Sequence, residues 1–565
     1  MTARSRATRR RRAAAAKPQA TAEKQTATRP WPSWALPVAL AVLHFFVLLA
    51  AYNPAPPTGG DDATYLALAR SLLTTGTYRD IWDPLTPPHV QYPPVFPLIL
   101  AGGLAVGLTP AFGLKMIIIV FSACAIGLSV AWMRKIAGTV ISAAVGFALA
   151  LSPGLATISH AVLSDVPFWA MTMLALLLWQ RYQENVDAGA FVSPRDEKLD
   201  VAVAAAAIVL ANFTRSAGLP LVAAAAIWVL YRRRPAALAV LLAVVLPPIL
   251  LWWIRTQSAG HGGYVAPFMA RNPYDPSQGT IGLSDLPERI GRNLTYYLGT
   301  GIPTSLTGRR WPGMWLGIPV AALAVSGWIR RLRKPALPEI WVVLYVGLIL
   351  LWPSTWSSER FILPLLPLLL LYACQTLPWM LRPVPKAEAL VPVTACAILV
   401  VLLIPDLSRE FRNSAGCRAE TADVTLACTD STYAAFFHLA DETRGKLPAG
   451  SVVLSRKPSI FFMRSGYRSA LYPLSSDPEQ FYRAADSVGA NYVVVDQIPG
   501  LGPHYLHPIL LARRDDFCVI NELSWSNASL AQIDTSAPPR KNVTAPNSFR
   551  GCPLSQRRAP PARRP

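Results

Sequence analysis

The sequence has little charge. Only 15% of its 565 residues are Asp, Glu, Lys or Arg, whereas 52% are hydrophobic and the mean hydropathy is +0.33. A soluble protein with a single core does not contain so much apolar sequence, and long apolar runs recur along the chain. The composition therefore excludes an ordinary soluble protein and predicts a polytopic α-helical membrane protein.

Several motifs that mark common enzyme classes are missing. The chain has no P-loop, no glycine-rich dinucleotide fingerprint and no HExxH, so an ATP-driven or nicotinamide-dependent enzyme has no support. The formal net charge of +21 could indicate nucleic-acid binding. However, the basic residues lie in short segments between apolar runs and no motif interleaves them with aromatic residues, so we expect no nucleic-acid partner.

The apolar runs predict about eleven transmembrane helices, several of them at the short end of the roughly 17–25 residues that a span requires. The run 94–109 begins with prolines, contains Gly102 and Gly103 and ends at Pro110, so we interpret it as a re-entrant or interfacial helix. The predicted spans are 34–52, 113–133, 138–157, 166–180, 201–213, 217–231, 236–254, 312–328, 339–352, 361–380 and 388–405.

The distribution of charge predicts which side of the membrane each loop faces. The tail 1–33 is basic, with consecutive arginines from Arg9 to Arg12. A cleaved signal peptide would begin in a similar way, but the many following spans favour a retained first helix and a cytoplasmic N-terminus. If 94–109 does not cross, every short basic cluster falls on the cytoplasmic side of the cell (inner) membrane, as the positive-inside rule requires. These clusters are Arg134 with Lys135, 181–198, 232–234, 330–334, and Arg382 with Lys386.

The sequence changes character after the last predicted span. The transmembrane domain would cover 34–405, and region 406–535 would form an extracytoplasmic domain. Alternating helix and strand signals there predict a small α/β fold. The tail 536–565 is rich in Pro, Arg and Ser and is predicted to be disordered. The predicted elements of the α/β domain are helices at 431–444 and 478–488 and strands at 451–455 and 492–496.

The cysteines divide in the same way. Three lie in predicted spans, where they are expected to be inert small hydrophobic residues: Cys124, Cys374 and Cys396. The four in the extracytoplasmic region are even in number on an oxidising face, which predicts disulfides between Cys417 and Cys428 and between Cys518 and Cys552. A zinc site is the alternative, but no histidine has the required spacing from Cys417 or Cys428.

Two adjacent carboxylates, Asp61 and Asp62, follow the first span on the face opposite the basic N-terminus. Charge at a membrane boundary is costly to desolvate unless it has a role. One aspartate suffices to cap the helix that starts here, which leaves the other free as a general base or metal ligand. Asp165, two residues before Pro167, heads another helix on the same face. Capping is its simplest role, and together with the Asp61 loop it is a candidate second acid of one site.

Arginines and aromatic residues on the same face could complete such a site. Arg215 and Arg360 lie at extracytoplasmic helix ends, and arginine is suited to bidentate contact with phosphate. The alternatives are snorkelling at the membrane interface for both residues and a local ion pair with Glu359 for Arg360. Three residues before the Pro93-Pro94 turn could line the same cleft: His89, Gln91 and Tyr92.

The order of these motifs resembles the GT-C glycosyltransferases, within which the chain is most similar to bacterial aminoarabinose transferases and protein O-mannosyltransferases. The likeness covers roughly residues 34–405 and departs at Gln91, where aminoarabinose transferases usually have a lysine. The motifs that carry it are Gly60-Asp61-Asp62-Ala63-Thr64-Tyr65, Tyr92-Pro93-Pro94-Val95-Phe96-Pro97-Leu98, Leu163-Ser164-Asp165, Thr214-Arg215 and Glu359-Arg360-Phe361.

The resemblance implies an enzyme that takes a sugar from a polyprenyl-phosphate carrier and transfers it to an acceptor hydroxyl outside the membrane. It makes Asp61, with Asp62 beside it, the catalytic base, Asp165 a second acidic residue, and Arg215 and Arg360 binders of the donor phosphate. Direct attack on the anomeric carbon would invert its configuration. The acceptor could be a lipid, glycan or protein, and no cofactor is certain, although a divalent metal could assist. The alternatives are a transporter or flippase of a lipid-linked sugar and a non-catalytic assembly protein. We expect Asp61, Asp62 and Asp165 to converge on one extracytoplasmic cleft.

Overall fold

The structure is a computed structural model of the chain. It describes residues 32–56, 58–109, 112–259, 263–380, 387–419, 428–523, 525–533 and 550–552. The predicted cytoplasmic tail up to residue 31 and most of the tail predicted to be disordered lie outside the described residues.

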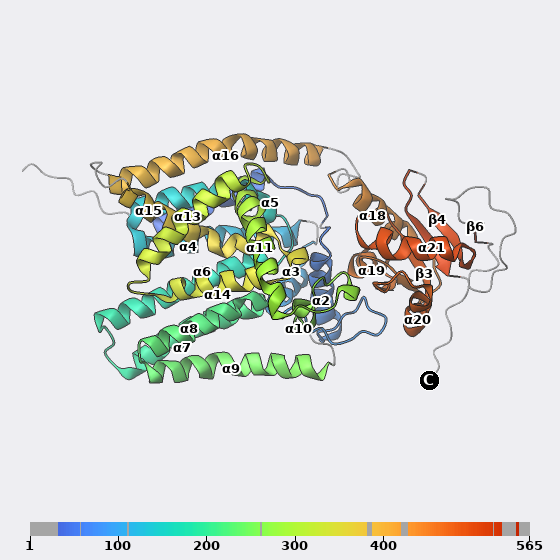
Figure 1. Ribbon diagram of the computed structural model, residues 1–565, viewed down its shortest axis with the longest axis horizontal. Coiled ribbons are helices and arrows are strands. Elements are labelled where there is room, and N and C mark those ends of the chain that lie inside the picture. Colours follow the sequence, from blue (N-terminus) through green and yellow to red (C-terminus); the bar gives the residue numbers. More distant parts are fainter. Residues whose placement is uncertain are drawn as a thin grey trace, which may run out of the picture. The chain divides into compact units, whose positions relative to one another are not determined.

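Most of the chain is helical (Figure 1). The α-helices that precede the C-terminal domain are α1 (Ala35–Ala50), α2 (Asp61–Thr75), α3 (Val95–Ala105), α4 (Gly113–Ala150), α5 (Pro153–Ile158), α6 (Asp165–Ala188), α7 (Pro194–Thr214), α8 (Leu219–Tyr231), α9 (Pro235–Ser258), α10 (Val265–Met269), α11 (Leu286–Tyr296), α12 (Ile302–Thr307), α13 (Met314–Arg331), α14 (Leu337–Leu351), α15 (Leu366–Met380) and α16 (Ala387–Ala419). Short 3₁₀ or π-helical segments join some of them: η1 (Ser216–Gly218), η2 (Pro276–Gln278), η3 (Leu283–Asp285), η4 (Tyr297–Gly301), η5 (Ser354–Trp356) and η6 (Glu359–Leu365).

Every predicted span coincides with helix, although the number of crossings is not confirmed. Within the described ranges, four helices are long and apolar enough to cross a membrane, namely Gly113–Ala150, Pro235–Ser258, Glu359–Met380 and Leu390–Ala419. Shorter apolar helices are Ala35–Ala50, Val95–Ala105, Ser216–Tyr231 and Leu337–Leu351.

The observed bounds of α3, α4 and α16 differ from the predicted ones. The spans 113–133 and 138–157 are largely the two halves of α4, which are separated at Gly138 by non-helical dihedral angles of φ 74° and ψ 179°. Helix α3 has 11 residues, too few to cross a hydrocarbon core about 30 Å thick at a rise of about 1.5 Å per residue. Helix α16 continues past residue 406, the expected start of the extracytoplasmic region, to Ala419.

The basic loops gather at one end of the helical part. The turns α6–α7, α8–α9 and α13–α14 lie at the left of Figure 1, away from α2, α3 and α10. Ion pairs connect neighbouring helix ends there, because Arg232 pairs with Asp187 and Arg234 Nη1 lies 3.0 Å from Glu197 Oε1. This arrangement agrees with the predicted topology, which assigns these loops to the cytoplasm and stays a prediction.

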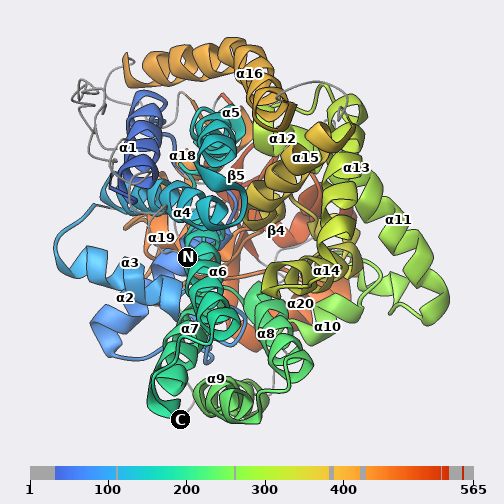
Figure 2. The ribbon, with the colours of Figure 1, turned by 90° about the vertical axis from the view of Figure 1, so that its left-hand side faces the viewer.

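Helix α6 is central to the packing of this part (Figure 2). It contacts α4, α7 and η6, and Trp169, Trp179 and Tyr182 on it are fully buried. By contrast, α9 buries only three residues and exposes Leu250, Leu251, Trp253 and Ile254. An apolar helix with such an exposed surface is suited to contact lipid.

The C-terminal domain is a mixed sheet with helices on both faces. Strands β1 (Val452–Leu454), β2 (Arg468–Ala470), β3 (Ala490–Val495), β4 (Phe517–Glu522), β5 (Ser529–Ile533) and β6 (Arg550–Gly551) have the order β2-β1-β3-β5-β4-β6. Strand β1 pairs in parallel with β2 and β3, whereas β5 is antiparallel to β3 and β4, and β6 is parallel to β4. The helices are α18 (Ser431–Thr443), α19 (Pro458–Ser465), α20 (Pro478–Val488) and α21 (His507–Ala512), with η7 (Gly502–Leu506) and η8 (Arg514–Asp516).

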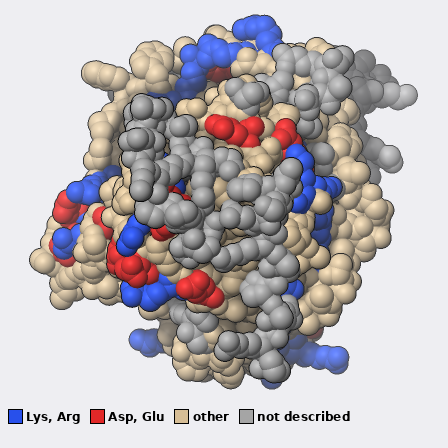
Figure 3. All heavy atoms as spheres, turned by 90° about the vertical axis from the view of Figure 1, so that its right-hand side faces the viewer, with Lys and Arg blue, Asp and Glu red and all other residues tan. Residues whose placement is uncertain are grey.

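Alternation along β3 explains the two cores of this domain. Tyr492 and Val494 pack with α18 and α19, whereas Val493 and Val495 pack with α20 and α21. Both faces of the central strand are therefore buried, as expected for an α/β layer structure. On the face shown in Figure 3, acidic and basic side chains lie beside one another.

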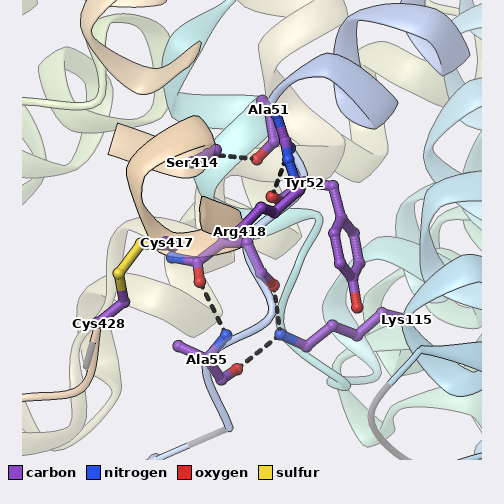
Figure 4. The surroundings of a disulfide bond; sticks show 9 residues. Ala51, Tyr52, Ala55, Lys115, Ser414, Cys417, Arg418 and Cys428 are labelled. Carbon is purple, nitrogen blue, oxygen red and sulfur yellow. Dashed lines mark hydrogen bonds between the residues drawn. A yellow bond between two sulfur atoms is a disulfide. The ribbon is translucent and has the colours of Figure 1, made fainter. Parts of the chain in front are cut away.

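The four cysteines of this region are bonded as Cys417–Cys428 and Cys518–Cys552. Figure 4 shows that the first disulfide lies where α16 meets the segment after α1. Ser414 donates to the Ala51 carbonyl at 2.7 Å and Arg418 to the Tyr52 carbonyl at 2.8 Å. The end of α16 therefore holds the backbone that leads to α2.

Candidate active site

The first turn of α2 separates the two adjacent aspartates. The N-cap residue is Gly60, which has φ 90° and no side chain with which to cap the helix. Asp62 Oδ1 takes over that role and accepts the backbone N–H groups of Gly60 and Ala63, both at 3.0 Å. Because successive residues of a helix point about 100° apart, Asp61 faces a different side from Asp62.

Asp62 is buried and hydrogen-bonded to the backbone. Its side chain is only 4% exposed, and burial together with the neighbouring Asp61 raises its pKa to about 6. It lines a separate cavity of about 250 Å³, between α2, the start of α4 and the C-terminal domain. The structure therefore brings Asp61 and Asp165 together, and it places Asp62 apart from them.

Asp61 and Asp165 share one arginine. Arg360 Nη2 lies 2.9 Å from Asp61 Oδ2, and Arg360 Nη1 lies 3.6 Å from Asp165 Oδ2. Arg215 Nη1 lies 2.5 Å from Asp165 Oδ1. Asp165 is almost fully buried at 3% exposure, whereas Asp61 is 35% exposed. The negative charge of the buried Asp165 is thus compensated by two guanidinium groups, whereas the Asp61 carboxylate remains partly exposed.

Tyr92 supplies a second partner to Asp61. Its hydroxyl donates to Asp61 Oδ1 at 2.9 Å, and burial raises the pKa of Tyr92 well above its ordinary value, which keeps the hydroxyl protonated. His89 positions this residue, because its Nε2 accepts the Tyr92 backbone N–H at 2.8 Å and its Nδ1 lies 2.6 Å from Asp80 Oδ1. The accepting Nε2 fixes the tautomer with the proton on Nδ1.

These groups surround a cavity of about 310 Å³. Gln91 and Tyr92 line it as predicted from their position, whereas His89 does not and acts from behind Tyr92. Four aromatic residues of the cavity were not singled out from the sequence, where the available signal was the density of Tyr and Trp in loops 255–311 and 352–360. They are Tyr264, Tyr274, Trp352 and Trp356. The lining residues are Gly59, Asp61, Tyr65, Gln91, Tyr92, Pro93, Arg215, Ser216, Tyr264, Tyr274, Trp352, Thr355, Trp356, Ser357, Arg360 and Phe361.

A second, mostly apolar cavity of about 200 Å³ adjoins the first. The second extends along α14 to Leu348 and Ile349. The residues that line both cavities are Arg215, Ser216, Tyr264, Trp352 and Phe361. Arg215 is held at this junction by the ring of Phe361, 4.7 Å from its guanidinium carbon. An anionic group that continues into an apolar chain would fit this pair of cavities.

A divalent metal would find few ligands here. In the described ranges, no group of three or more His, Cys, Asp or Glu side chains is arranged to hold a metal ion. Asp61, which lines the cavity, is paired with Arg360, and Asp165, which does not, is paired with Arg215.

Several solved structures share this architecture. ArnT from Cupriavidus metallidurans bound to undecaprenyl phosphate aligns with a TM-score of 0.54 and 15% identity, over 89% of this chain and 99% of that one. The oligosaccharyltransferase AglB from Archaeoglobus fulgidus, in complex with an inhibitory peptide and a dolichol-phosphate, aligns with a TM-score of 0.55 and 12% identity, over 90% and 75% of the two chains. No family profile and no curated protein matches the sequence.

ArnT, an aminoarabinose transferase, and AglB are both members of the GT-C superfamily. The chain therefore shares the fold of these two GT-C proteins, and the fold expected from the motifs is confirmed. An identity of 12–15% shows that the fold is shared but does not show that the reaction is shared.

Proposed function

We propose that the protein is a GT-C-type glycosyltransferase that moves a sugar from a polyprenyl-phosphate donor to an acceptor hydroxyl, on the extracytoplasmic face of the membrane and with inversion. The observation that carries this proposal is the half-exposed Asp61, held by Arg360 and Tyr92 in a polar cavity that adjoins an apolar one.

The two adjoining cavities support a donor that is polar at one end and apolar at the other. In this proposal the sugar occupies the cavity beside Asp61, and the first part of the prenyl chain occupies the cavity along α14. The phosphate would then lie near Arg215, which lines both cavities. ArnT bound to undecaprenyl phosphate and AglB in complex with a dolichol-phosphate have the same fold, which supports this donor class by analogy.

The reaction needs one base and stabilisation of one leaving group. The acceptor oxygen attacks the anomeric carbon while its proton passes to the Asp61 carboxylate. The bond between the anomeric carbon and the phosphate oxygen breaks, and polyprenyl phosphate leaves with that electron pair. Attack opposite the leaving group inverts the configuration. The departing phosphate gains one negative charge, which Arg215 and Arg360 can stabilise.

Asp165 supports this arrangement without contacting the cavity. Because Asp165 pairs with Arg215 and lies near Arg360, it fixes both guanidinium groups near the N-terminal end of α6. Fixed cations of this kind need little reorganisation when charge develops on the phosphate.

The test is sugar transfer by the purified protein in detergent, with synthetic polyprenyl-phosphate sugars of different sugar identity and an acceptor mixture from the cell envelope. We expect release of polyprenyl phosphate and a new glycosidic bond, both dependent on Asp61. If the protein instead moves the same lipid across vesicle membranes without cleaving it, the alternative of a transporter or flippase replaces the transferase.

A further inference from the structure

The C-terminal domain contacts the turn that carries Asp61. Helix α19 packs against α2, and Lys457, at its N-cap, donates from Nζ to the Gly59 carbonyl at 3.0 Å. Ser459 Oγ lies 3.3 Å from the Gly60 carbonyl and 3.1 Å from Thr64 Oγ1. Two residues from a distant part of the chain therefore hold the carbonyls on which α2 begins.

The turn is held from within at Gly60, whose N–H donates to Asp62 Oδ1 and whose carbonyl accepts from the Thr64 N–H and hydroxyl, all at 3.0 Å. It contains consecutive glycines, Gly59 and Gly60, and the second adopts the left-handed φ of 90°. A Cβ on Gly60 would lie 3.4 Å from Lys457 Nζ, an ordinary contact, so glycine is favoured here by the left-handed backbone and not by lack of space. Gly59 lines the active cavity itself. Small movements of the turn would therefore change both the cavity wall and the direction of Asp61.

The ammonium group of Lys457 also lies within electrostatic reach of Asp61 and Asp62, although it forms no ion pair with either among the described contacts. Its hydrogen-bond partner is the neutral Gly59 carbonyl. A cation at this point offsets the repulsion between two adjacent carboxylates while leaving Asp61 open toward the cavity.

A second contact of the C-terminal domain lies on the segment that leads to Tyr92, the hydroxyl partner of Asp61. The Ser469 backbone N–H donates to the Trp82 carbonyl at 2.8 Å, and Arg468 Nη1 donates to the Pro84 carbonyl at 3.1 Å. This segment leads to His89, which positions Tyr92 and hence its hydrogen bond to Asp61. Strand β2 thus contacts the segment that leads to His89 and Tyr92, and the start of α19 contacts the turn that carries Asp61.

We propose that Lys457 is a positioning residue for the transfer reaction: its hydrogen bond to Gly59 sets the orientation in which Asp61 faces the acceptor. This inference rests on the proposed function, and it makes the C-terminal domain a working part of the active site. A displacement of a base by about 1 Å lowers turnover by up to about 100-fold, whereas donor contacts elsewhere in the cavity are unaffected.

The experiment compares three variants of the full-length protein in detergent. Lys457→Met keeps most of the length of the side chain and removes both the charge and the donor, whereas Lys457→Arg keeps both. Lys446→Met is the matched control, because Lys446 is an exposed lysine of the same domain that lies in the turn after α18. Transfer kinetics are measured together with hydrogen–deuterium exchange of the amides of residues 59–64, which reports on the turn whether or not the protein transfers sugar.

We expect Lys457→Met to lower kcat by about 10- to 100-fold with little change in the donor KM, and to accelerate exchange at 59–64. Lys457→Arg should recover most of the lost kcat, and Lys446→Met should resemble the wild type. Unchanged exchange in Lys457→Met, or faster exchange with unchanged kcat, would overturn the inference. If the wild type transfers no sugar, the proposed function fails by itself, and the exchange data still decide whether Lys457 holds the turn.

Discussion

Arg360 and Asp61 are ion-paired at 2.9 Å, although 299 positions separate them along the chain. The same guanidinium reaches toward Asp165, so one arginine connects an accessible and a buried carboxylate. Such a bridge holds Asp61 in a fixed orientation, and an incoming acceptor hydroxyl can approach its exposed side.

Asp61→Asn is expected to abolish most transfer activity, because the amide cannot accept the proton of the acceptor hydroxyl. A general base typically contributes about 10²- to 10⁴-fold to the rate, so kcat should fall by that factor while donor binding persists. The matched control is Asp62→Asn, which retains the side-chain oxygen that accepts the Gly60 and Ala63 N–H groups. Equal losses in both variants would contradict the separate roles of the two residues.

Arg360→Lys should be far from conservative. Lysine keeps the positive charge, but a single ammonium group cannot address Asp61 and Asp165 with two separate nitrogens as the guanidinium does. We expect kcat to fall by at least about 10-fold, since removing one preorganised hydrogen-bond donor to a developing charge typically costs about 10²–10³ in kcat and lysine retains part of the interaction. Steady-state kinetics with the donor concentration varied will measure this fall in kcat. A wild-type kcat in Arg360→Lys would show that the contacts of Arg360 with the two aspartates are not needed for transfer.

Asp62 should make the stability of the protein depend on pH. Its pKa is raised from 3.8 to about 6, because burial and Asp61 disfavour the charged form. The folded state therefore holds this proton more tightly than the unfolded state, and stability falls as the pH rises from about 4 to about 6. Thermal unfolding in detergent across this range should give a smaller slope for Asp62→Asn.

Asp496→Asn is a second test of the same effect. Burial raises the pKa of Asp496 to about 6 as well, so this residue contributes a slope of the same sign in the same window. Each single variant should remove part of the slope, and the double variant should remove more than either. A profile that neither substitution changes would contradict the burial of both carboxylates.

The apolar cavity can be tested by filling it. Leu348→Trp places a larger side chain in the proposed path of the prenyl chain. We expect a higher KM for long-chain donors and little change for donors truncated to one or two prenyl units. Val343→Trp is the control, because Val343 lies on the same helix but is 50% exposed. Equal effects on donors of every chain length would place the prenyl chain elsewhere.

The topology is open to a direct test with reporter fusions after Arg234 and after Asp430. The positive-inside rule predicts a cytoplasmic reporter after Arg234 and an extracytoplasmic one after Asp430. Alkaline phosphatase and green fluorescent protein fusions, which are active on opposite sides, will distinguish them. Two fusions that report the same side would invalidate both the topology and the proposed face of the reaction.

Local patterns explain which elements were predictable in the C-terminal domain. Helix α20 matches its predicted bounds, because Asp477 caps it, proline follows and Gly489 ends it. Strands β2, β4, β5 and β6 were not predicted, and β6 lies in the tail expected to be disordered. Strands β2 and β5 show the reason. The first has three residues, and the second buries Ser529 and Gln532 although both are polar. Their strand conformation depends on pairing with neighbours that are distant in sequence, and the pattern of apolar residues cannot show it.

The sequence by itself determined the membrane character of the protein, the positions of most helices and the occurrence of Asp61, Asp165, Arg215 and Arg360 at helix ends, because apolar runs and local charge carry that information. Only the tertiary structure decided which of the two adjacent aspartates faces the cavity. That choice depends on the left-handed turn at Gly60, on Asp62 satisfying the backbone, and on partners brought from η6 and α19. Contacts over hundreds of residues leave no periodic trace in a sequence, so the geometry of the site becomes visible only after the chain has folded.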